Sequence, residues 1–282
     1  MTQHENDLRQ YSLSFLTIAD VSPVEAVKIA ATCGYSKVGL RLLPAAQNEA
    51  QYPILTHQKL LNETQAVLKD TGVNVADVEI VRITPEFEPQ HYLQFLDVAQ
   101  KLNAKHILIA ADDTELERLV QNFSIFCELS QQFGLSCDLE FMPWTAVKNL
   151  AKANEIVEKS GQENAAVLID ALHFDRSDSS FEQIQLLPAS RMNYLQLCDG
   201  LSVYERDNES LIKTARTNRL VPGQGEIDLV SLIRALPSNL TLAAEVPNQK
   251  LSKLPAMQRA KINLEAMKQL VAQSEQVDAY RG

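Results

Sequence analysis

The chain has 282 residues, of which 26 are basic and 36 acidic, so its formal net charge at neutral pH is −10. This acidic balance disfavours binding to the phosphate backbone of nucleic acids and to anionic membrane surfaces. No apolar run approaches the roughly 20 residues needed to span a bilayer. The polar opening MTQHENDLRQ lacks the apolar region of a signal peptide. We therefore expect a cytoplasmic protein without a nucleic-acid or membrane partner.

The chain alternates short, β-rich apolar segments with longer segments whose apolar residues recur at helical spacing. The first predicted strand, 11–18, precedes a helix that starts at Ser22 and Pro23 and stops at Gly34. Further strands are predicted at 37–42, 75–83, 106–111, 136–141, 165–170, 193–198 and 241–246, and further helices at 57–72, 89–104, 114–134 and 146–161. The segment 200–227 is predicted to be irregular, and loops of that length are usually functional.

Strict alternation of strand and helix implies parallel strands joined by right-handed crossovers. Eight such units in 282 residues match the α/β class and a single (β/α)8 TIM barrel, which we predict for residues 1–282. An open, doubly wound sheet is the alternative, but it usually has about five or six strands and a glycine-rich phosphate turn after the first. The sequence contains neither a dinucleotide-binding nor a P-loop motif, so it does not support a nucleotide cofactor.

Acidic and amide side chains stand at the carboxyl ends of four consecutive predicted strands, where TIM barrels have their active sites. They are Glu140, Asp170, Gln196 and Glu245. Because side chains alternate along a strand, these four meet near the barrel axis if their face points inward. Three carboxylates and an amide in a closed space need a cation, and oxygen ligands favour Mg²⁺ or Mn²⁺ over Zn²⁺. We predict one divalent metal site. For each residue singly, the alternative is a hydrogen-bonded polar group at a strand end.

Further candidates for the site lie near the same end of the predicted barrel. His173 follows the sixth strand and is placed to hydrogen-bond a substrate hydroxyl or to shuttle a proton, with a surface histidine as the alternative. Arg216 and Arg219 lie in the long segment, where a flexible arm would clamp an anionic or hydroxylated substrate, with solvated surface charge as the alternative. Arg41 and Glu79 either line the far side of the pocket or form an internal ion pair.

With these residues the chain resembles the xylose-isomerase-like TIM-barrel superfamily of sugar isomerases and epimerases, which also includes endonuclease IV and the 3-dehydroshikimate dehydratases. The resemblance covers essentially the whole chain through the segments SLSFLTIAD, LEFMPW, VLIDALHF, YLQLCD, VPGQGEIDL and LAAEVPN. Endonuclease IV is a poor match, because its three-metal site needs several further histidines at strand ends. This chain has only His173 there.

The resemblance also implies roles for particular residues. Ketose epimerases and hydroxypyruvate isomerases of this superfamily bind one divalent ion through Glu, Asp, His and Glu. On the matching motifs these ligands fall on Glu140, Asp170, Gln196 and Glu245. Gln196 thus replaces the usual histidine, as in bacterial dehydroshikimate dehydratases, which also have an R-x-x-R-x-x-PGQGE-like segment after that strand. The catalytic histidine falls on His173 and the substrate-binding arginine on Arg216 or Arg219.

Our leading hypothesis is a divalent-metal-dependent isomerase or epimerase of a sugar or sugar-like hydroxyketone. Glu140 and Glu245 would remove and return a proton next to the metal-bound carbonyl, through an enediolate. Loss of a β-hydroxyl, assisted by His173 as acid, would instead make the protein a dehydratase (lyase) of the 3-dehydroshikimate type. A barrel that binds a sugar or a partner without turnover is the third alternative, and it predicts no tightly held metal. A homo-oligomer is left open.

Overall fold

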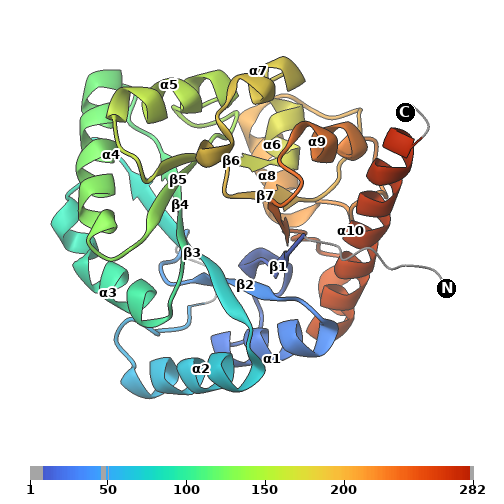
Figure 1. Ribbon diagram of the computed structural model, residues 1–282, viewed down its shortest axis with the longest axis horizontal. Helices are drawn as coiled ribbons and strands as arrows, with labels where there is room; N and C mark the ends of the chain where they lie inside the picture. Colours follow the sequence, from blue (N-terminus) through green and yellow to red (C-terminus); the bar gives the residue numbers. More distant parts are fainter. Residues whose placement is uncertain (1–8, 46–48, 50, 280–282) are drawn as a thin grey trace.

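Eight parallel strands close into a barrel in the computed structural model, which describes residues 9–45, 49 and 51–279 (Figure 1). The strands pair in chain order, and β1 closes the barrel against β8. They are β1 Tyr11–Leu13, β2 Lys37–Arg41, β3 Asn74–Ile83, β4 His106–Ala111, β5 Ser136–Glu140, β6 Ala165–Asp170, β7 Tyr194–Leu197 and β8 Thr241–Ala244. The predicted (β/α)8 TIM barrel is confirmed.

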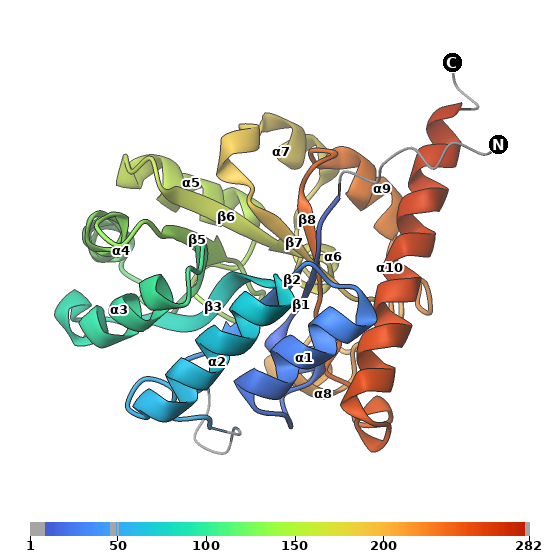
Figure 2. The same ribbon diagram turned by 60° about the horizontal axis from the view of Figure 1, so that its bottom comes forward.

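Helices surround the barrel on its outside and alternate with the strands along the chain (Figures 1 and 2). They are α1 Pro23–Cys33, α2 Gln58–Thr71, α3 Leu93–Lys101, α4 Leu116–Gln131, α5 Leu150–Ser160, α6 Ala171–Arg176, α7 Phe181–Leu186, α8 Asn208–Thr217, α9 Leu229–Ala235 and α10 Ala256–Ala279. The long α10 packs against α1 and α9, so the last helix joins the ring beside the first (Figure 2). Among the residues described, no helix is both long and apolar enough to cross a bilayer.

The ends of α1 show how local sequence sets an element's bounds. The Ser22 hydroxyl accepts a hydrogen bond from the Glu25 N–H, and the Glu25 carboxylate accepts one from the Ser22 N–H. Pro23 occupies the first turn, where a missing N–H costs nothing. Gly34 ends the helix with φ +93°, a left-handed conformation that favours glycine. The predicted start and stop of this helix are confirmed.

Two predicted boundaries are wrong, since the first strand ends earlier and the fifth helix begins later than predicted. The first strand stops at Leu13, and residues Phe15–Thr17 form a 3-10 turn. The turn places the Thr17 hydroxyl to donate a hydrogen bond across to the Ala244 carbonyl, at 2.8 Å. The fifth helix starts only at Leu150, because Asn149 caps it by accepting from the Lys152 N–H.

The segment 200–227 is not irregular throughout, as was predicted. It contains α8, which Asp207 caps by accepting a hydrogen bond from the Ser210 N–H at 2.9 Å. Only Leu211 and Ala215 of this helix are buried, and the segment is polar on average, so few apolar residues mark it as a helix in the sequence. Arg216 therefore lies in the last turn of a helix and not on a flexible arm.

Alternate side chains of each strand face the outer core and the barrel interior. Along β5, Cys137 and Leu139 pack in the large core between strands and helices, whereas Asp138 and Glu140 face the interior. On β7, Leu195 belongs to the same outer core. The interior itself holds only a small apolar cluster, formed by Ile80, Leu108, Ala110, Met142, Leu168, Tyr194 and Ala243. The rest of the barrel interior is therefore available to polar groups.

Candidate active site

A cavity of about 480 Å³ opens at the carboxyl ends of the strands. Its charged lining consists of Arg41, Glu49, Glu79, Arg82, Glu140, His173, Arg216, Arg219 and Glu245, and its apolar lining consists of Leu16, Ala45, Ile80, Leu108, Met142, Trp144 and Ala215. Such a cavity holds a small molecule of sugar size and is the place where TIM barrels carry out their chemistry.

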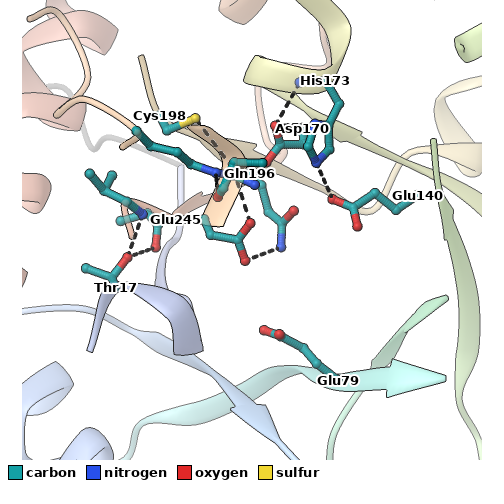
Figure 3. A network of polar contacts seen from close by, with 12 residues as sticks. Thr17, Glu79, Glu140, Asp170, His173, Gln196, Cys198 and Glu245 are labelled. Atoms are coloured by element: carbon teal, nitrogen blue, oxygen red, sulfur yellow. Dashed lines mark hydrogen bonds and ion pairs between the residues drawn. The ribbon is translucent and has the colours of Figure 1, made fainter. Parts of the chain in front are cut away.

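The four residues predicted to converge do so at this end of the barrel (Figure 3). Glu140 and Asp170 are the last residues of β5 and β6, Gln196 lies within β7, and Glu245 follows β8 directly. Each is at least 96% buried. The Gln196 Nε2 donates a hydrogen bond to Glu245 Oε1 at 2.9 Å. The sequence therefore placed these side chains on the correct face of their strands.

Arg219 lies among these carboxylates instead of reaching over them from a flexible arm. Its Nη1 forms an ion pair with Asp170 Oδ2 and lies 3.2 Å from Glu245 Oε2. Its Nε donates a hydrogen bond to the Ala215 carbonyl at 2.7 Å, which ties it to α8. The side chain is 3% exposed. The structure thus makes Arg219 an internal counter-ion, held on one edge of the cavity.

Burial acts to raise the pKa of every carboxyl group in the cluster, but neighbouring charges reverse the outcome for one of them. Burial, with Asp170 and Glu245 nearby, raises the pKa of Glu140 well above its usual range. Burial also raises the pKa of Glu245, to about 8, although Arg219 opposes that shift. For Asp170, burial acts upward, but the charge of Arg219 and the contacts with His173 outweigh it and lower the pKa. Within this site, Asp170 is the carboxylate that the protein itself keeps ionised.

His173 is buried beside the cluster and is not a surface histidine. Its Nε2 lies 3.7 Å from Glu140 Oε1, and its main-chain N–H donates to Asp170 Oδ1 at 3.0 Å. Trp144 packs edge-on against the ring, with 5.0 Å between centroids. Burial lowers the pKa of His173 to about 4, so the imidazole is neutral at physiological pH. A neutral imidazole offers one donor and one acceptor nitrogen for proton transfer.

Several polar atoms here suit a metal ion. Glu140, Asp170 and His173 can each offer a ligand atom, all within 4.8 Å of one another. Gln196 Oε1 is buried without a hydrogen-bond partner among the described residues. Over the same part of the chain, no donor hydrogen-bonds Glu140, and the His173 imidazole lies 3.7 Å from its Oε1. Unpartnered buried oxygens are costly unless a cation or a proton satisfies them.

Arg41 and Glu79 face this cluster from β2 and β3 and form an internal ion pair. Arg41 donates to Glu79 Oε2 from Nε at 3.0 Å and from Nη2 at 2.6 Å. Its Nη1 binds both oxygens of Glu49, at 2.8 Å each. All three residues line the cavity. The two alternatives left open by the sequence are therefore both met: the pair is internal and also forms the cavity wall.

The charges around the centre of the cavity do not balance. The innermost carboxylates are those of Glu79, Glu140, Asp170 and Glu245, and the guanidiniums that contact them are those of Arg41 and Arg219. When all four are ionised, two negative charges remain uncompensated; without an ion, protons on Glu140 and Glu245, whose pKa values burial raises, would balance them. One divalent ion would balance them as well, so the residues present fit the predicted metal.

Arg216 differs from the other two arginines of the cavity centre. It is exposed, it lines the same cavity, and it has no acidic partner within the described part of the chain. Because it stands in the last turn of α8, its charge also faces the favourable end of that helix dipole. Arg216 is thus the arginine most available to an anionic group on a ligand.

Asp199 is a residue that the sequence analysis did not single out. It follows β7, and its carboxylate accepts four main-chain N–H bonds, from Gly200, Gly223, Gly225 and Ile227, at 2.8 to 3.1 Å. These bonds hold the PGQGE segment against the barrel, directly after Arg219. An aspartate at a strand end, followed by two closely spaced glycines, is the signal that could have revealed this contact.

Replacing Gly225 with Ala is expected to destabilise the protein by at least about 3 kcal/mol, because the fold has no room for a methyl group there. A Cβ atom at this position would clash with the Asp199 carboxylate and lie 2.5 Å from the Gly200 carbonyl oxygen. Urea unfolding measures the loss. Gly161→Ala is the control, since a Cβ there meets nothing within 4 Å; we expect it to cost about 1 kcal/mol through its positive φ alone. Equal costs would contradict the proposed clash.

Three known proteins place this barrel among its relatives. A curated protein of Halalkalibacterium halodurans named inosose isomerase is 23% identical over 151 residues, which are 50% of this chain and 51% of that protein. The chain thus matches about half the length of this relative. The crystal structure of the IolI protein with a bound zinc atom superposes with a TM-score of 0.77 at 16% identity, over 94% of this chain and 99% of that one.

A second similar structure is the probable 3-DHS dehydratase AsbF from Bacillus anthracis. It has a TM-score of 0.73 and 16% identity and covers 92% of this chain and 98% of its own. At these identities the two structures show the fold. The family model described as "Xylose isomerase-like TIM barrel" matches residues 27–270. The resemblance seen in the sequence is therefore confirmed, and the chain belongs to the xylose isomerase-like TIM barrel family.

Proposed function

We propose that the protein is a divalent-metal-dependent isomerase or epimerase of a small, sugar-like hydroxyketone. The observation that carries this proposal is the buried carboxylate cluster at the carboxyl ends of β5, β6 and β8, whose carboxyl groups outnumber the guanidiniums that pair with them. The relative named inosose isomerase supports the same class of reaction. The substrate would occupy the adjoining cavity of about 480 Å³.

The metal ion would be held by oxygen atoms, those of Glu140, Asp170, Gln196 and Glu245. We favour Mn²⁺ or Mg²⁺ over Zn²⁺, because carboxylate and amide oxygens are the ligands of hard ions. When bound, the ion would supply polarisation of the substrate carbonyl and so acidify the adjacent C–H bond. Gln196 Oε1, which lacks a hydrogen-bond partner among the described residues, is the amide atom suited to this role.

Glu140 and Glu245 approach the substrate from different sides of the barrel, one from β5 and the other from β8. One would remove the proton and the other return it, to the opposite face for epimerisation or to the next carbon for isomerisation. Burial raises the pKa of each in the absence of an ion, so each carboxyl group is able to hold a proton. His173 would exchange a proton with a substrate hydroxyl next to Glu140.

Proton NMR in D₂O tests this proposal. Mg²⁺-reconstituted protein would be incubated with a panel of ketoses, inososes, hydroxypyruvate and 3-dehydroshikimate. We expect loss of an α-proton signal together with a new sugar-like product. If no compound exchanges a proton and elemental analysis finds no metal after reconstitution, the third alternative, a barrel that binds without turnover, replaces this proposal.

A dehydratase of the 3-dehydroshikimate type is the second candidate, and Arg216 is the observation that favours it. A carboxylated substrate needs a cation outside the reaction centre. The exposed guanidinium of Arg216 lines the cavity without an acidic partner among the described residues. His173 would then pass the proton that Glu140 has taken from the substrate to the departing β-hydroxyl, which leaves as water. Aromatic signals of protocatechuate in the NMR experiment would establish this reaction.

Replacing Arg216 with Ala is expected to separate the two candidates. If the substrate carries a carboxylate, KM should rise at least about tenfold, because a charged hydrogen bond contributes roughly 1.5–3 kcal/mol. With a neutral ketose as substrate, kcat/KM should stay within about twofold. Arg206→Ala is the matched control, since Arg206 is an exposed arginine of the same segment, stacks near Tyr204 and does not line the cavity. Steady-state kinetics of the three proteins give the answer.

A further inference from the structure

Two of the carboxylates proposed as metal ligands, those of Asp170 and Glu245, already have partners within the protein. Asp170 accepts from the His173 N–H on Oδ1 and pairs with Arg219 on Oδ2. Glu245 accepts from Gln196 Nε2 on Oε1, at 2.9 Å, and lies 3.2 Å from the Arg219 guanidinium on Oε2. All four oxygens of these two carboxylates therefore have a partner (Figure 3).

Glu140 and Gln196 show the opposite pattern. Glu140 accepts no hydrogen bond within the described ranges of the chain, and Gln196 Oε1 is likewise without a partner. A metal ion would thus meet two ready ligands and two occupied ones. Both occupied ligands have Arg219 as a partner.

A main-chain contact holds the Arg219 side chain beside these carboxylates. Its Nε bond to the Ala215 carbonyl, at 2.7 Å, fixes the middle of the side chain to α8, whereas Nη1 alone reaches both carboxylates. Nη1 also lies 3.5 Å from the Cys198 sulfur. Because the guanidinium is planar and includes Nε, it moves as one unit through turns about the side-chain bonds up to Cδ–Nε, and such a turn would also weaken the Nε bond to Ala215. The cavity that Arg219 already lines provides the space on that side.

Two cations that share carboxylates in a buried site repel each other strongly, because little water screens them. A divalent ion and the guanidinium also compete for the same oxygen lone pairs. Binding of the ion must therefore overcome a charge that the protein itself supplies. Binding of the ion is weaker by that amount. Without the ion, the same contacts of Arg219 stabilise the protein.

We propose that Arg219 is an internal competitor of the metal ion, which occupies Asp170 and Glu245 in the metal-free protein and withdraws from at least one of them when the ion binds. The withdrawn guanidinium then faces the cavity, where it meets an oxygen of the substrate. The inference rests on the proposed function, since it takes these carboxylates as metal ligands. It adds that Arg219 sets the affinity for the ion and that the ion prepares the site for substrate.

Metal affinity tests this inference without any measurement of turnover. Free Mn²⁺ is followed by its EPR signal as Mn²⁺ is titrated into the wild type and into Arg219→Gln, Arg219→Lys and Arg191→Gln. We expect Arg219→Gln to bind Mn²⁺ at least tenfold more tightly than the wild type, because the competing charge is gone. Arg219→Lys should fall between the two, since a lysine ammonium keeps the charge but cannot bridge both carboxylates in the same way.

Arg191→Gln is the matched control for loss of a guanidinium. Arg191 donates to the carbonyls of Gln162 and Ala165 at the amino end of β6, on the opposite side of the barrel from the cavity. The affinity of the Arg191→Gln variant for Mn²⁺ should match that of the wild type within twofold. If Arg219→Gln does not fold without metal, the comparison of Arg219→Lys with the wild type takes its place, and a several-fold tightening is expected there.

Two outcomes overturn the inference, and they are distinguishable. If the wild type binds Mn²⁺ but the Arg219 variants bind it equally or more weakly, Arg219 supports the ligands and does not compete, and the proposed function stands. If no protein of the series binds Mn²⁺, Mg²⁺ or Zn²⁺, the metal assignment of the proposed function fails together with this inference.

Discussion

Glu245→Gln is expected to lower the turnover number by about a thousandfold, the largest effect we predict for activity. The amide keeps the size of the side chain but cannot accept the substrate proton, and general acid–base groups contribute roughly 10²–10⁴-fold. It also removes one negative charge from the proposed metal site. Glu140→Gln should have an effect of the same order. Loss of the α-proton signal in D₂O and formation of product, both followed by NMR, measure the change.

The two variants should also differ in what they retain. The variant that still exchanges the α-proton without forming product has lost the group that returns the proton. Comparing Glu140→Gln with Glu245→Gln therefore shows which carboxylate removes the proton and which returns it. Glu226→Gln is the control, because Glu226 lies in the PGQGE segment, binds the exposed Ser202 and does not line the cavity. A loss of less than tenfold in both Glu140→Gln and Glu245→Gln would contradict the proposed chemistry.

Arg41→Met is expected to give the largest loss of stability, about 3–5 kcal/mol in the free energy of unfolding. The reason lies in its partner, since Glu79 has a fully buried side chain whose Oε2 receives two hydrogen bonds from Arg41. Without the guanidinium, that carboxylate stays buried and uncompensated. The double variant Arg41→Met/Glu79→Gln should lose less than half as much, because it removes both charges. Urea unfolding of the single and double variants completes the cycle.

Arg82→Met is the matched control for this pair. Arg82 forms an ion pair with Asp112, but both side chains are about one-third exposed. Water screens such a pair, so we expect a loss of no more than about 1 kcal/mol. If Arg41→Met costs no more than Arg82→Met, burial does not govern the energetics of the Arg41–Glu79 pair.

The sequence predicted the barrel and much of the site because both follow from alternation. Leu139 and Ile169 had to face the helices, so Glu140 and Asp170, one residue on, had to face the barrel interior. Nothing beyond strand parity and chain order was needed. The carboxyl ends of parallel strands meet at one end of a barrel wherever the loops run.

The partners of Arg219 could not be predicted in this way. Its contacts with Asp170 and Glu245 span 49 and 26 positions of the sequence and depend on how α8 seats against the barrel. That helix has only two buried apolar residues, so the sequence offers little to indicate which side of it packs on the barrel. The role of Asp199 is also long-range, because three of its four main-chain donors lie 24 to 28 positions further along the chain, and only the glycines among them hint at it in the sequence.

The joint between β1 and β8 determines when the site is completed during folding. The Thr17 hydroxyl donates to the Ala244 carbonyl and accepts from the Val246 N–H, both at 2.8 Å. It therefore hydrogen-bonds the main chain on both sides of Glu245. These contacts join residues 227 and 229 positions apart, the kind of long-range closure that forms slowly. In an intermediate with strands β2 to β7 paired, Glu140 would already be in place. Glu245 would not, because β8 would not yet be paired with its neighbours. Catalytic competence should therefore appear with ring closure, as the last event of folding.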